Sequence, residues 1–174
     1  METPTLATVV FLRNKAGEIC LAQKKKPIHH DAGELTYSLE TWNGYGGKKE
    51  ESDKTIEDTA IRELEQESDV FAEKSNLIPC GHVYFFWPNN ENEEQSLADM
   101  EVFFYFLDVW TGEPREGAEM GPPQFFSPET VPYDKMMEGD ALLLPRMLSG
   151  EMVSGSVYLG KKDAFGRTLF VPSV

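Results

Sequence analysis

The segment TIEDTAIRELEQES, residues 55–68, constrains the fold of this chain more than any other. It contains no glycine or proline, and Thr55 with Asp58 three positions later resembles a capping box, so we predict a helix that begins after Thr55. On a helical wheel with the first isoleucine at the origin, Ala60 falls at about 40° and Leu64 at about 80°, which defines an apolar stripe. The helix is therefore expected to bury this stripe against the rest of the protein.

Two acidic side chains of this helix lie on the apolar stripe. On the same wheel Glu67 falls at about 20° and Glu63 at about −20°, whereas Glu65 lies at about 180°. A solvated helix face accounts for Glu65 but not for the other two, because an uncompensated buried carboxylate is costly. The pattern therefore predicts either a metal site built on Glu63 and Glu67 or a buried network of ion pairs, and it leaves both open.

The arginine of the helix and the segment before the helix supply further groups for such a site. Arg62 falls on the flank of the helix at about 240°, where it suits an ion pair with Asp58 or with Asp53 in the preceding loop. WNGYGG, residues 42–47, has three glycines, which is typical of a backbone that turns sharply or allows a close approach. Carbonyl oxygens of such a turn and carboxylates at positions i and i+4 are ligands that suit Mg²⁺ or Mn²⁺.

The charge of the chain limits the partners that it can bind. The 174 residues include 30 Asp and Glu against 16 Lys and Arg, which gives a formal net charge of −14. Most of such a surface repels a nucleic acid polymer, so we expect none as a partner. A small anionic nucleotide can still bind if a divalent cation is bound first, because the cation reverses the sign of the local field.

The length predicts a single domain over residues 1–174, with a core that needs no disulfide or structural metal. Cys20 and Cys80 each lie in an apolar run, so we interpret them as buried thiols. The opening METPTLATVVF lacks the basic start of a signal peptide and the apolar length of a membrane span. We therefore expect a cytoplasmic monomer without a membrane partner.

Short runs of β-forming residues predict most of the remaining structure. Residues 7–12 and 18–23 are expected to form a first hairpin, and residues 24–34 a polar loop. Residues 134–150 read as a second helical region, interrupted by a glycine and a proline. Because few connections are long helical crossovers, the pattern favours an α+β protein with a mixed, twisted sheet and helices on its faces. Further strands are predicted at residues 81–87, 100–109, 124–127, 153–160 and 167–173.

The stretch WNGYGGKKEESDKTIEDTAIRELEQESDV, residues 42–70, resembles the signature of the Nudix hydrolase family, whose helix carries the segment REUXEEXGU with U aliphatic. Within that family the chain is similar to enzymes that hydrolyse oxidised purine nucleoside triphosphates. The similarity extends from about Leu6 to Gly160, through ordered fragments such as LATVVFL, LAQKK, GHVYFFW, MEVFFYF, EGAEMGPP and VPYDKMMEGDALLLP. The resemblance implies the Nudix fold, an α/β/α sandwich.

The chain departs from this signature in several places. Asp53 stands where the family has a glutamate, and Arg62 follows it one residue late, so the loop has gained a residue. Asp69 replaces a glycine that ends the helix, which is tolerable because aspartate enters the left-handed region more readily than most residues. Gln66 replaces the second glutamate of REUXEE and removes one charge from the cation site. We expect a weakened second or third metal site rather than an inactive enzyme.

The resemblance also implies a metal site and a reaction. Glu63 and Glu67 are implied to hold Mg²⁺, or alternatively Mn²⁺, together with a carbonyl of the double-glycine turn at Gly47. Glu119 is implied to supply a further carboxylate. Glu67 is our choice for the general base, with Glu63 and Arg62 as the other catalytic residues of the helix. Water attacks a phosphorus, and the products are a nucleoside monophosphate and pyrophosphate.

A separate site is expected to bind the base. Lys24 matches a lysine that contacts phosphates in relatives, and a solvated lysine at a strand end is an equal alternative. Asn43 offers a donor and an acceptor to a purine edge. Asp140 matches one of a pair of pocket aspartates, and the partner position is Gly139, which leaves the preference for an oxidised base open. Apolar walls for the base are expected from Phe85, Trp87, Met100 and Met137.

Three functions remain open from the sequence. The first is Mg²⁺-dependent hydrolysis of a purine nucleoside triphosphate, with 8-oxo-dGTP and 2-hydroxy-dATP among the candidates and sanitation of the nucleotide pool as the role. The second is Nudix hydrolysis of another nucleoside diphosphate derivative, which Gly139 and the longer loop at residues 24–41 keep open. The third is a nucleotide sensor without catalysis, in which Gln66 marks a decayed site.

Overall fold

The computed structural model describes residues 3–25, 28–30, 33–37, 40–88 and 97–174, with the side chains of residues 28–30 and 33–37 left out of the description. Its helices are α1 (Ile56–Ser68) and α2 (Glu138–Leu148), with short 3-10 turns η1 (Lys74–Asn76) and η2 (Tyr133–Lys135). Its strands, in chain order, are β1 (Thr5–Leu12), β2 (Ile19–Gln23), β3 (Ile28–His30), β4 (Gly33–Tyr37), β5 (Trp42–Asn43), β6 (Leu77–Phe86), β7 (Met100–Leu107), β8 (Gln124–Phe126), β9 (Val153–Lys162) and β10 (Thr168–Pro172).

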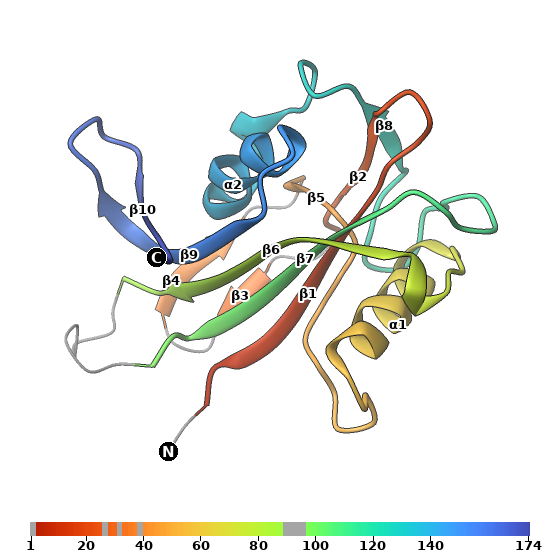
Figure 1. The fold of residues 1–174 in the computed structure, drawn as a ribbon, viewed down its shortest axis with the longest axis horizontal. Helices are drawn as coiled ribbons and strands as arrows, with labels where there is room; N and C mark the ends of the chain where they lie inside the picture. The colour runs from red at the N-terminus through yellow and green to blue at the C-terminus, as the bar shows by residue number, and fades with distance from the viewer. Residues whose placement is uncertain (1–2, 26–27, 31–32, 38–39, 89–96) are drawn as a thin grey trace.

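The main sheet is mixed and has the strand order β1-β7-β6-β9-β10. β1 runs parallel to β7, and β6 runs antiparallel to β7 but parallel to β9. Two smaller sheets, β5-β2-β8 and β3-β4, complete the set in the described residues. In Figure 1, α1 lies beside β1 and α2 lies beside β9. The predicted α+β class with a mixed sheet and helices on its faces is confirmed.

Strand β7, with the sequence MEVFFYFL, shows why the sheet has a helix on each face. Successive residues of a strand point to opposite faces, and here both faces are apolar. Phe104 and its alternate neighbours belong to the core that contains Leu143, Leu144 and Met147 of α2. Tyr105 and Leu107 belong to the second core, which contains the apolar stripe of α1. The sheet is therefore the middle layer of a sandwich between two helices.

Helix α1 begins and ends as the sequence predicts. The hydroxyl of Thr55 accepts a hydrogen bond from the Asp58 N–H at 3.2 Å, and the Asp58 carboxylate accepts one from the Thr55 N–H at 2.8 Å. These two bonds form the capping box. The helix ends at Asp69, whose φ of 58° is left-handed. Ala60 and Leu64 of the predicted apolar stripe are fully buried.

Two predictions about the N-terminal strands are wrong. β1 and β2 do not form a hairpin ladder but join different sheets, and in the described residues a single bridge from Arg13 to Ile19 links them across the turn. The reason is that β7 pairs with one edge of β1 and the segment around Tyr45 with the other. The predicted loop at 24–34 contains β3, which pairs with β4, because local backbone pairing needs no apolar sequence.

The glycines of residues 42–47 allow the chain to run along the edge of β1. Tyr45 and Val10 exchange two backbone hydrogen bonds, of 2.6 and 3.0 Å, and the Thr8 N–H donates to the Gly47 carbonyl at 2.9 Å. A Cβ atom at Gly46 would lie 1.9 Å from the Thr8 carbonyl oxygen. Glycine is therefore required there by a close approach of two backbones, as the sequence predicts.

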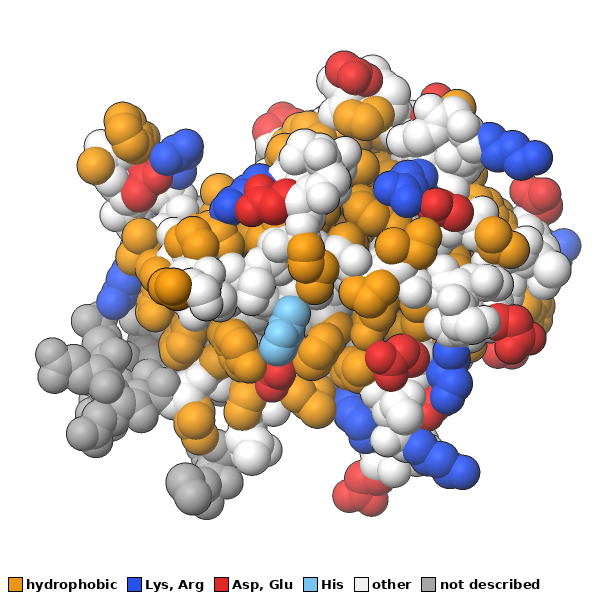
Figure 2. All heavy atoms as spheres, in the orientation of Figure 1, with side chains coloured by type: hydrophobic (Ala, Val, Ile, Leu, Met, Phe, Trp, Pro, Cys, Tyr) orange, Lys and Arg blue, Asp and Glu red, His pale blue; other side chains and the backbone are white. Residues whose placement is uncertain are grey.

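Charged side chains of both signs are spread over the molecular face in Figure 2, with hydrophobic side chains between them over the sheet. Several basic side chains are paired with acids, including Arg13 with Asp108 at 2.8 Å and Lys74 with Asp58 at 2.7 Å. Within the described residues, neither helix is long and apolar enough to cross a lipid bilayer.

Candidate active site

A cavity of about 210 Å³ opens between β1, the glycine segment, β7 and the first turn of α2. It collects residues from distant parts of the sequence. All of the residues predicted to bind substrate line it, namely Lys24, Asn43, Phe85, Trp87, Met100, Met137 and Asp140.

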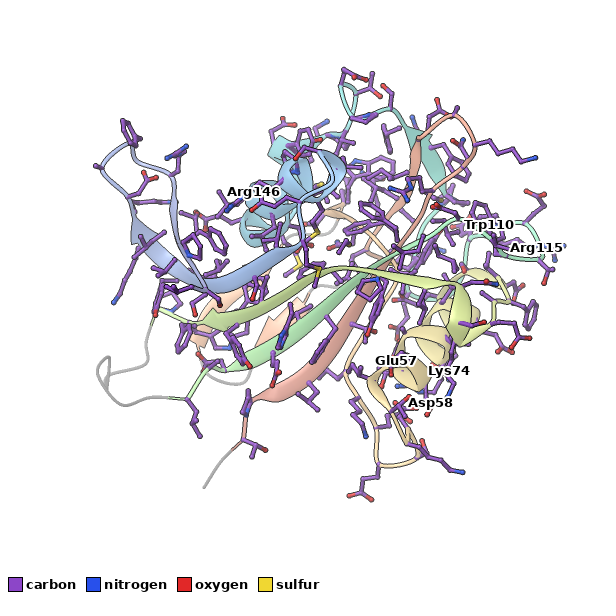
Figure 3. All side chains as sticks on the ribbon, in the orientation of Figure 1. Glu57, Asp58, Lys74, Trp110, Arg115 and Arg146 are labelled. Carbon is purple, nitrogen blue, oxygen red and sulfur yellow. The ribbon has the colours of Figure 1, made fainter. Side chains whose placement is uncertain are left out.

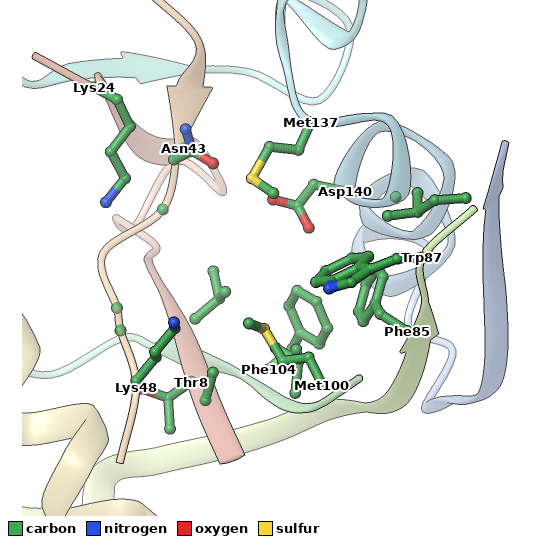
Figure 4. Close-up of a pocket in the computed structure, with 18 residues that line it drawn as sticks. Thr8, Lys24, Asn43, Lys48, Phe85, Trp87, Met100, Phe104, Met137 and Asp140 are labelled. Carbon is green, nitrogen blue, oxygen red and sulfur yellow. The ribbon is translucent and has the colours of Figure 1, made fainter. Parts of the chain in front are cut away.

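The cavity has an apolar side and a polar side. In Figure 4, Phe85, Trp87, Met100 and Phe104 stand together on one side, and Asn43 faces them across the opening. The Asn43 amide nitrogen donates to the Thr41 carbonyl at 3.1 Å, and its amide oxygen lies on the cavity side. This arrangement suits a flat ring that stacks on apolar groups and presents a polar edge.

Asp140 is the most unusual group of the cavity. It lies in the first turn of α2 and is 6% exposed, and its carboxyl makes no hydrogen bond among the described residues. Burial raises the pKa of its carboxyl to about 7, against the opposing field of Lys24. Near neutral pH both protonation states are therefore populated, so the group can either donate or accept a hydrogen bond.

The neighbour of Asp140 explains why it is the only acid on its wall among the described residues. A Cβ atom at Gly139 would lie 2.4 Å from Cε1 of the Phe85 ring. The ring of Phe85, which is buried, thus occupies the space that a side chain at this position would take. At this point the wall of the cavity is an aromatic surface.

Glu67 lies directly behind the cavity rim and is 6% exposed. Its Oε1 accepts a hydrogen bond from Lys24 Nζ at 3.0 Å, and its Oε2 accepts one from the Gly46 N–H at 2.8 Å. Burial raises the pKa of Glu67, against the opposing effects of Lys24 and the Gly46 N–H. The prediction that this acid lies on the buried stripe of the helix is confirmed.

Glu63 lies one turn earlier and is partly buried, with 16% of its side chain exposed. It accepts a hydrogen bond from Arg62 at 2.8 Å. Its carboxylate rests against the glycine segment, since a Cβ atom at Gly47 would lie only 2.5 Å from Glu63 Cδ. The missing side chain of Gly47 therefore makes a cradle for this carboxylate. Glu65 and Gln66 are exposed on the outer side of the helix.

Arg62 fastens the loop before the helix to the helix itself. Its guanidinium donates to both carboxylate oxygens of Asp53, at 2.9 and 2.8 Å, and to the Lys48 carbonyl at 3.1 Å. The bond to Arg62 holds the pKa of Asp53 well below its usual range. The sequence allows Arg62 to pair with either Asp53 or Asp58. The ion pair with Asp53 forms, because Asp58 is paired with Lys74.

Gln66, the departure from the family signature, and Glu119, the remaining predicted ligand, both lie outside the pair formed by Glu63 and Glu67. Gln66 accepts a hydrogen bond from Arg62 at 3.2 Å, so its amide belongs to the arginine network. Glu119 is exposed on a loop whose backbone accepts from the Lys25 N–H at 2.9 Å, beside Lys24. Among the described residues, no three His, Cys, Asp or Glu side chains are grouped to hold a metal ion. In this conformation ion pairs satisfy Glu63 and Glu67 instead.

Comparison with known proteins agrees with this geometry. The NUDIX domain family matches residues 3–147 of the chain. The chain belongs to the Nudix family. Two similar relatives are named oxidized purine nucleoside triphosphate hydrolase. The protein from Danio rerio is 33% identical over 155 residues, which cover 89% of this chain and 86% of the relative. The protein from Mus musculus is 32% identical over 163 residues, which cover 94% and 92%.

Solved Nudix structures share the fold at lower sequence identity. A MutT protein from Bacillus halodurans superposes with a TM-score of 0.67 at 18% identity, over 95% of this chain and 94% of that chain. A Nudix hydrolase from Nitrosomonas europaea gives 0.66 at 12% identity, over 91% and 81%. The chain is thus a Nudix hydrolase, an enzyme that acts on phosphoric anhydrides, in a family that generally uses divalent metal ions.

The Nudix helix α1 and the glycine segment provide oxygen atoms of the kind that bind divalent cations. Two carboxylates, Glu63 and Glu67, lie on one face of α1 and touch the same segment of backbone. Oxygen donors of this kind are those that Mg²⁺ and Mn²⁺ prefer. The cradle at Gly47 and the buried position of Glu67 place both acids where an uncompensated charge would be costly, so each needs a cation.

Two polar residues that line this Nudix cavity, Thr8 and Lys48, were not predicted from the sequence. The hydroxyl of Thr8 is buried, lines the cavity and has no hydrogen-bond partner in the described part of the chain. A threonine within the apolar run LATVVFL was the signal that could have identified it. Lys48 follows the double glycine and extends into the cavity in Figure 4. Its role depends on the fold, because a lysine in a loop carries no signal of its own.

Proposed function

We propose that this Nudix hydrolase is a Mg²⁺-dependent pyrophosphohydrolase that cleaves a purine nucleoside triphosphate, in ordinary or oxidised form, to a nucleoside monophosphate and pyrophosphate. One observation carries the proposal: Lys24 and Gly46 hold the Glu67 carboxylate and also line the cavity that contains Asn43 and Asp140. A carboxylate suited to chemistry on phosphate therefore adjoins a cavity suited to a base. The names of the two relatives support this substrate class.

The proposed cation ligands are Glu63, Glu67 and one backbone carbonyl, with Glu119 as a further carboxylate that turns inward from its loop. The Gly47 carbonyl is already engaged by the Thr8 N–H at 2.9 Å. In an extended chain the N–H and C=O of one residue point the same way, so the Gly46 carbonyl is expected on the Glu67 side. We therefore assign the carbonyl ligand to Gly46 in place of Gly47. A bound cation supplies positive charge that neutralises the phosphate oxygens and activates water.

The side chains of this protein carry out the remaining tasks. Glu67 is the proposed general base, because its carboxylate is held beside the cavity by Lys24 and the Gly46 N–H, where it can accept a proton from the attacking water. Lys24 and Lys48 line the cavity and are the proposed contacts of the phosphates. In a chain with a net charge of −14, two lysines on one cavity form a local positive field that draws the polyphosphate in.

The base is proposed to lie between the aromatic and polar sides of the cavity. Asn43 and Asp140 face its polar edge, and the unpaired hydroxyl of Thr8 is positioned to bond the nucleotide. Because Asp140 titrates near neutrality, it can pair with a donor or an acceptor on the purine. A single adaptable carboxyl, without a partner at Gly139, suits both ordinary and oxidised purines.

The substitution at Gln66 is compatible with catalysis in this arrangement. Gln66 is exposed and bonds Arg62, whereas Glu63 and Glu67 lie on the side of the glycine segment. A carboxylate is therefore missing from the outer edge of the site and not from its inner pair. This distribution disfavours the catalytically inactive sensor.

A panel of substrates tests the proposal. Pyrophosphate release is measured with Mg²⁺ and 8-oxo-dGTP, 2-hydroxy-dATP, dGTP or a dinucleoside polyphosphate. We expect the best purine triphosphate to exceed the dinucleotide in kcat/KM by at least about tenfold, since the cavity provides one base site. Faster turnover of the dinucleotide would instead support a Nudix hydrolase for another nucleoside diphosphate derivative, a possibility that the aromatic surface at Gly139 keeps open. Binding without turnover of any substrate would indicate a sensor.

A further inference from the structure

The ion pair between Lys24 and Glu67 has a consequence for the order of binding. We propose that Lys24 is an exchangeable counter-ion of Glu67, which neutralises this carboxylate in the metal-free protein and leaves it when a divalent cation binds. The inference rests on the metal site proposed above and adds a competition between a side chain of the protein and the metal. In the metal-free protein the negative charge of Glu67 is therefore neutralised by Lys24.

The geometry shows that Glu67 is fully engaged without a metal. One of its oxygens accepts from Lys24 Nζ at 3.0 Å and the other from the Gly46 N–H at 2.8 Å. Its side chain is only 5% exposed, so it is largely shielded from bulk water. A cation that coordinates Oε1 must take the position of the ammonium group, because a dication and an ammonium at one buried oxygen repel each other.

The cavity offers Lys24 an alternative position when its bond to Glu67 breaks. It follows β2 directly, 18% of its side chain is exposed, and it lines the cavity. In Figure 4 its ammonium lies beside the glycine segment and is turned away from Asn43, in keeping with its hydrogen bond to Glu67 at 3.0 Å. The buried carboxyl of Asp140 already senses its charge. A displaced Lys24 therefore remains in the cavity, where an anionic phosphate can receive it.

This exchange couples the two ligands of the enzyme. A metal ion that binds alone must break a partly buried ion pair, so its affinity is reduced. A nucleotide that attracts Lys24 through its phosphates removes this competition, so metal affinity rises when the nucleotide is present. The protein is therefore expected to load its metal mainly together with the substrate.

The test uses Mn²⁺ alone, without nucleotide. Mn²⁺ is titrated into wild-type protein and into Lys24→Met, and the free ion is followed by electron paramagnetic resonance. We expect Mn²⁺ to bind the variant about tenfold more tightly, because the competing positive charge has been removed from a poorly solvated site. An equal or lower affinity in the variant would overturn the proposal while leaving the proposed hydrolase function intact. Failure of Lys24→Met to bind Mn²⁺ would likewise overturn the exchange, whereas the proposed hydrolase function is tested separately by pyrophosphate release in the presence of nucleotide.

A matched control is available on the same helix. Lys74 pairs with Asp58 of α1 at 2.7 Å, and Figure 3 shows this pair on the outer surface, away from the cavity. Lys74→Met removes the same charge and also leaves a carboxylate of α1 unpaired, but at an exposed place. Its effect on Mn²⁺ affinity is expected to stay within about twofold, since solvent screens it. An equal gain in both variants would show a general charge effect and would overturn the proposal.

Lys24→Met is expected to be less stable than the wild type, because Glu67 loses its partner, and the stability of the variant gives a second readout. Mn²⁺ is expected to raise the melting temperature of Lys24→Met more than that of the wild type, since the ion restores the lost charge. Lys24→Gln provides a second variant, which keeps a donor for Glu67 without a charge. The same gain in Mn²⁺ affinity is expected for it, and its absence in both variants would contradict the exchange.

Discussion

At the scale of single residues, three buried carboxylates of this protein differ in what neutralises them. Asp53 is held by the guanidinium of Arg62, and Glu67 by the ammonium of Lys24 together with a backbone N–H. The carboxyl of Asp140 makes no hydrogen bond in the described residues, and its pKa rises accordingly to about 7. The carboxylate of Asp53 thus stabilises the loop before α1, that of Glu67 is the candidate general base, and that of Asp140 is a candidate contact of the substrate.

Replacement of the candidate base tests its assignment. Glu67→Gln is expected to lower kcat by at least about a hundredfold, because the amide keeps the shape of the side chain but accepts no proton. The measurement is pyrophosphate release at saturating nucleotide and Mg²⁺. Glu65→Gln removes an exposed charge from the outer face of the same helix and serves as the control. A kcat within a few-fold of wild type for Glu67→Gln would remove Glu67 from this role.

At the scale of elements, the glycine segment joins the strand, the helix and the cavity. It pairs with β1 through Tyr45, cradles Glu63 at Gly47 and holds Glu67 through the Gly46 N–H. The loop that follows is tied to α1 by the pair between Arg62 and Asp53. A small change of this segment is therefore transmitted to both acids at once.

Gly46→Ala tests this dependence. The new Cβ atom would lie 1.9 Å from the Thr8 carbonyl oxygen, so the segment must separate from β1. We expect a loss of about 3 kcal/mol in the free energy of unfolding, as for other overpacked positions, together with a loss of most activity. Gly121→Ala is the control, since its Cβ atom would meet its nearest neighbour, the Gln23 carbonyl oxygen, at an ordinary 3.4 Å. Urea unfolding that gives equal losses for both variants would contradict the close packing of this segment.

At the scale of the whole molecule, the net charge of −14 and the buried acid Asp140 both link stability to pH. Loss of surface charge on acidification relieves self-repulsion and affects every variant alike. Asp140 adds a separate contribution. Because its pKa is higher in the folded protein than in the unfolded chain, its contribution to stability is complete below about pH 4 and is lost as the pH rises through 7.

Asp140→Asn isolates this contribution from the general effect of charge. The stability of the variant relative to wild type is expected to increase between pH 4 and pH 8, by up to about 4 kcal/mol, because the asparagine does not ionise. Chemical denaturation at several pH values measures the difference. Asp134→Asn, at an exposed position, is the control and should show no such trend. A difference that stays constant across this pH range would show that Asp140 is not buried in a low-dielectric site.

Much of the candidate site could be predicted from local patterns. The length of α1, its capping box and the burial of Glu67 all depend on residues within a turn or two of each other, so periodicity is sufficient to find them. The need for glycine at Gly46 is likewise visible in the spacing of WNGYGG. The sequence by itself therefore determined which helix carries the acids and which of its faces they occupy.

Only the tertiary structure decided which groups meet these acids. Lys24 reaches Glu67 from 43 positions away, and the choice of Asp53 as the partner of Arg62 follows from the engagement of Asp58 by Lys74. The parallel pairing of β1 with β7 and the contact of Phe85 with Gly139 likewise join distant segments. Such contacts depend on how the strands are ordered in space, and the energies that order them are summed over the whole core, so no local pattern contains them.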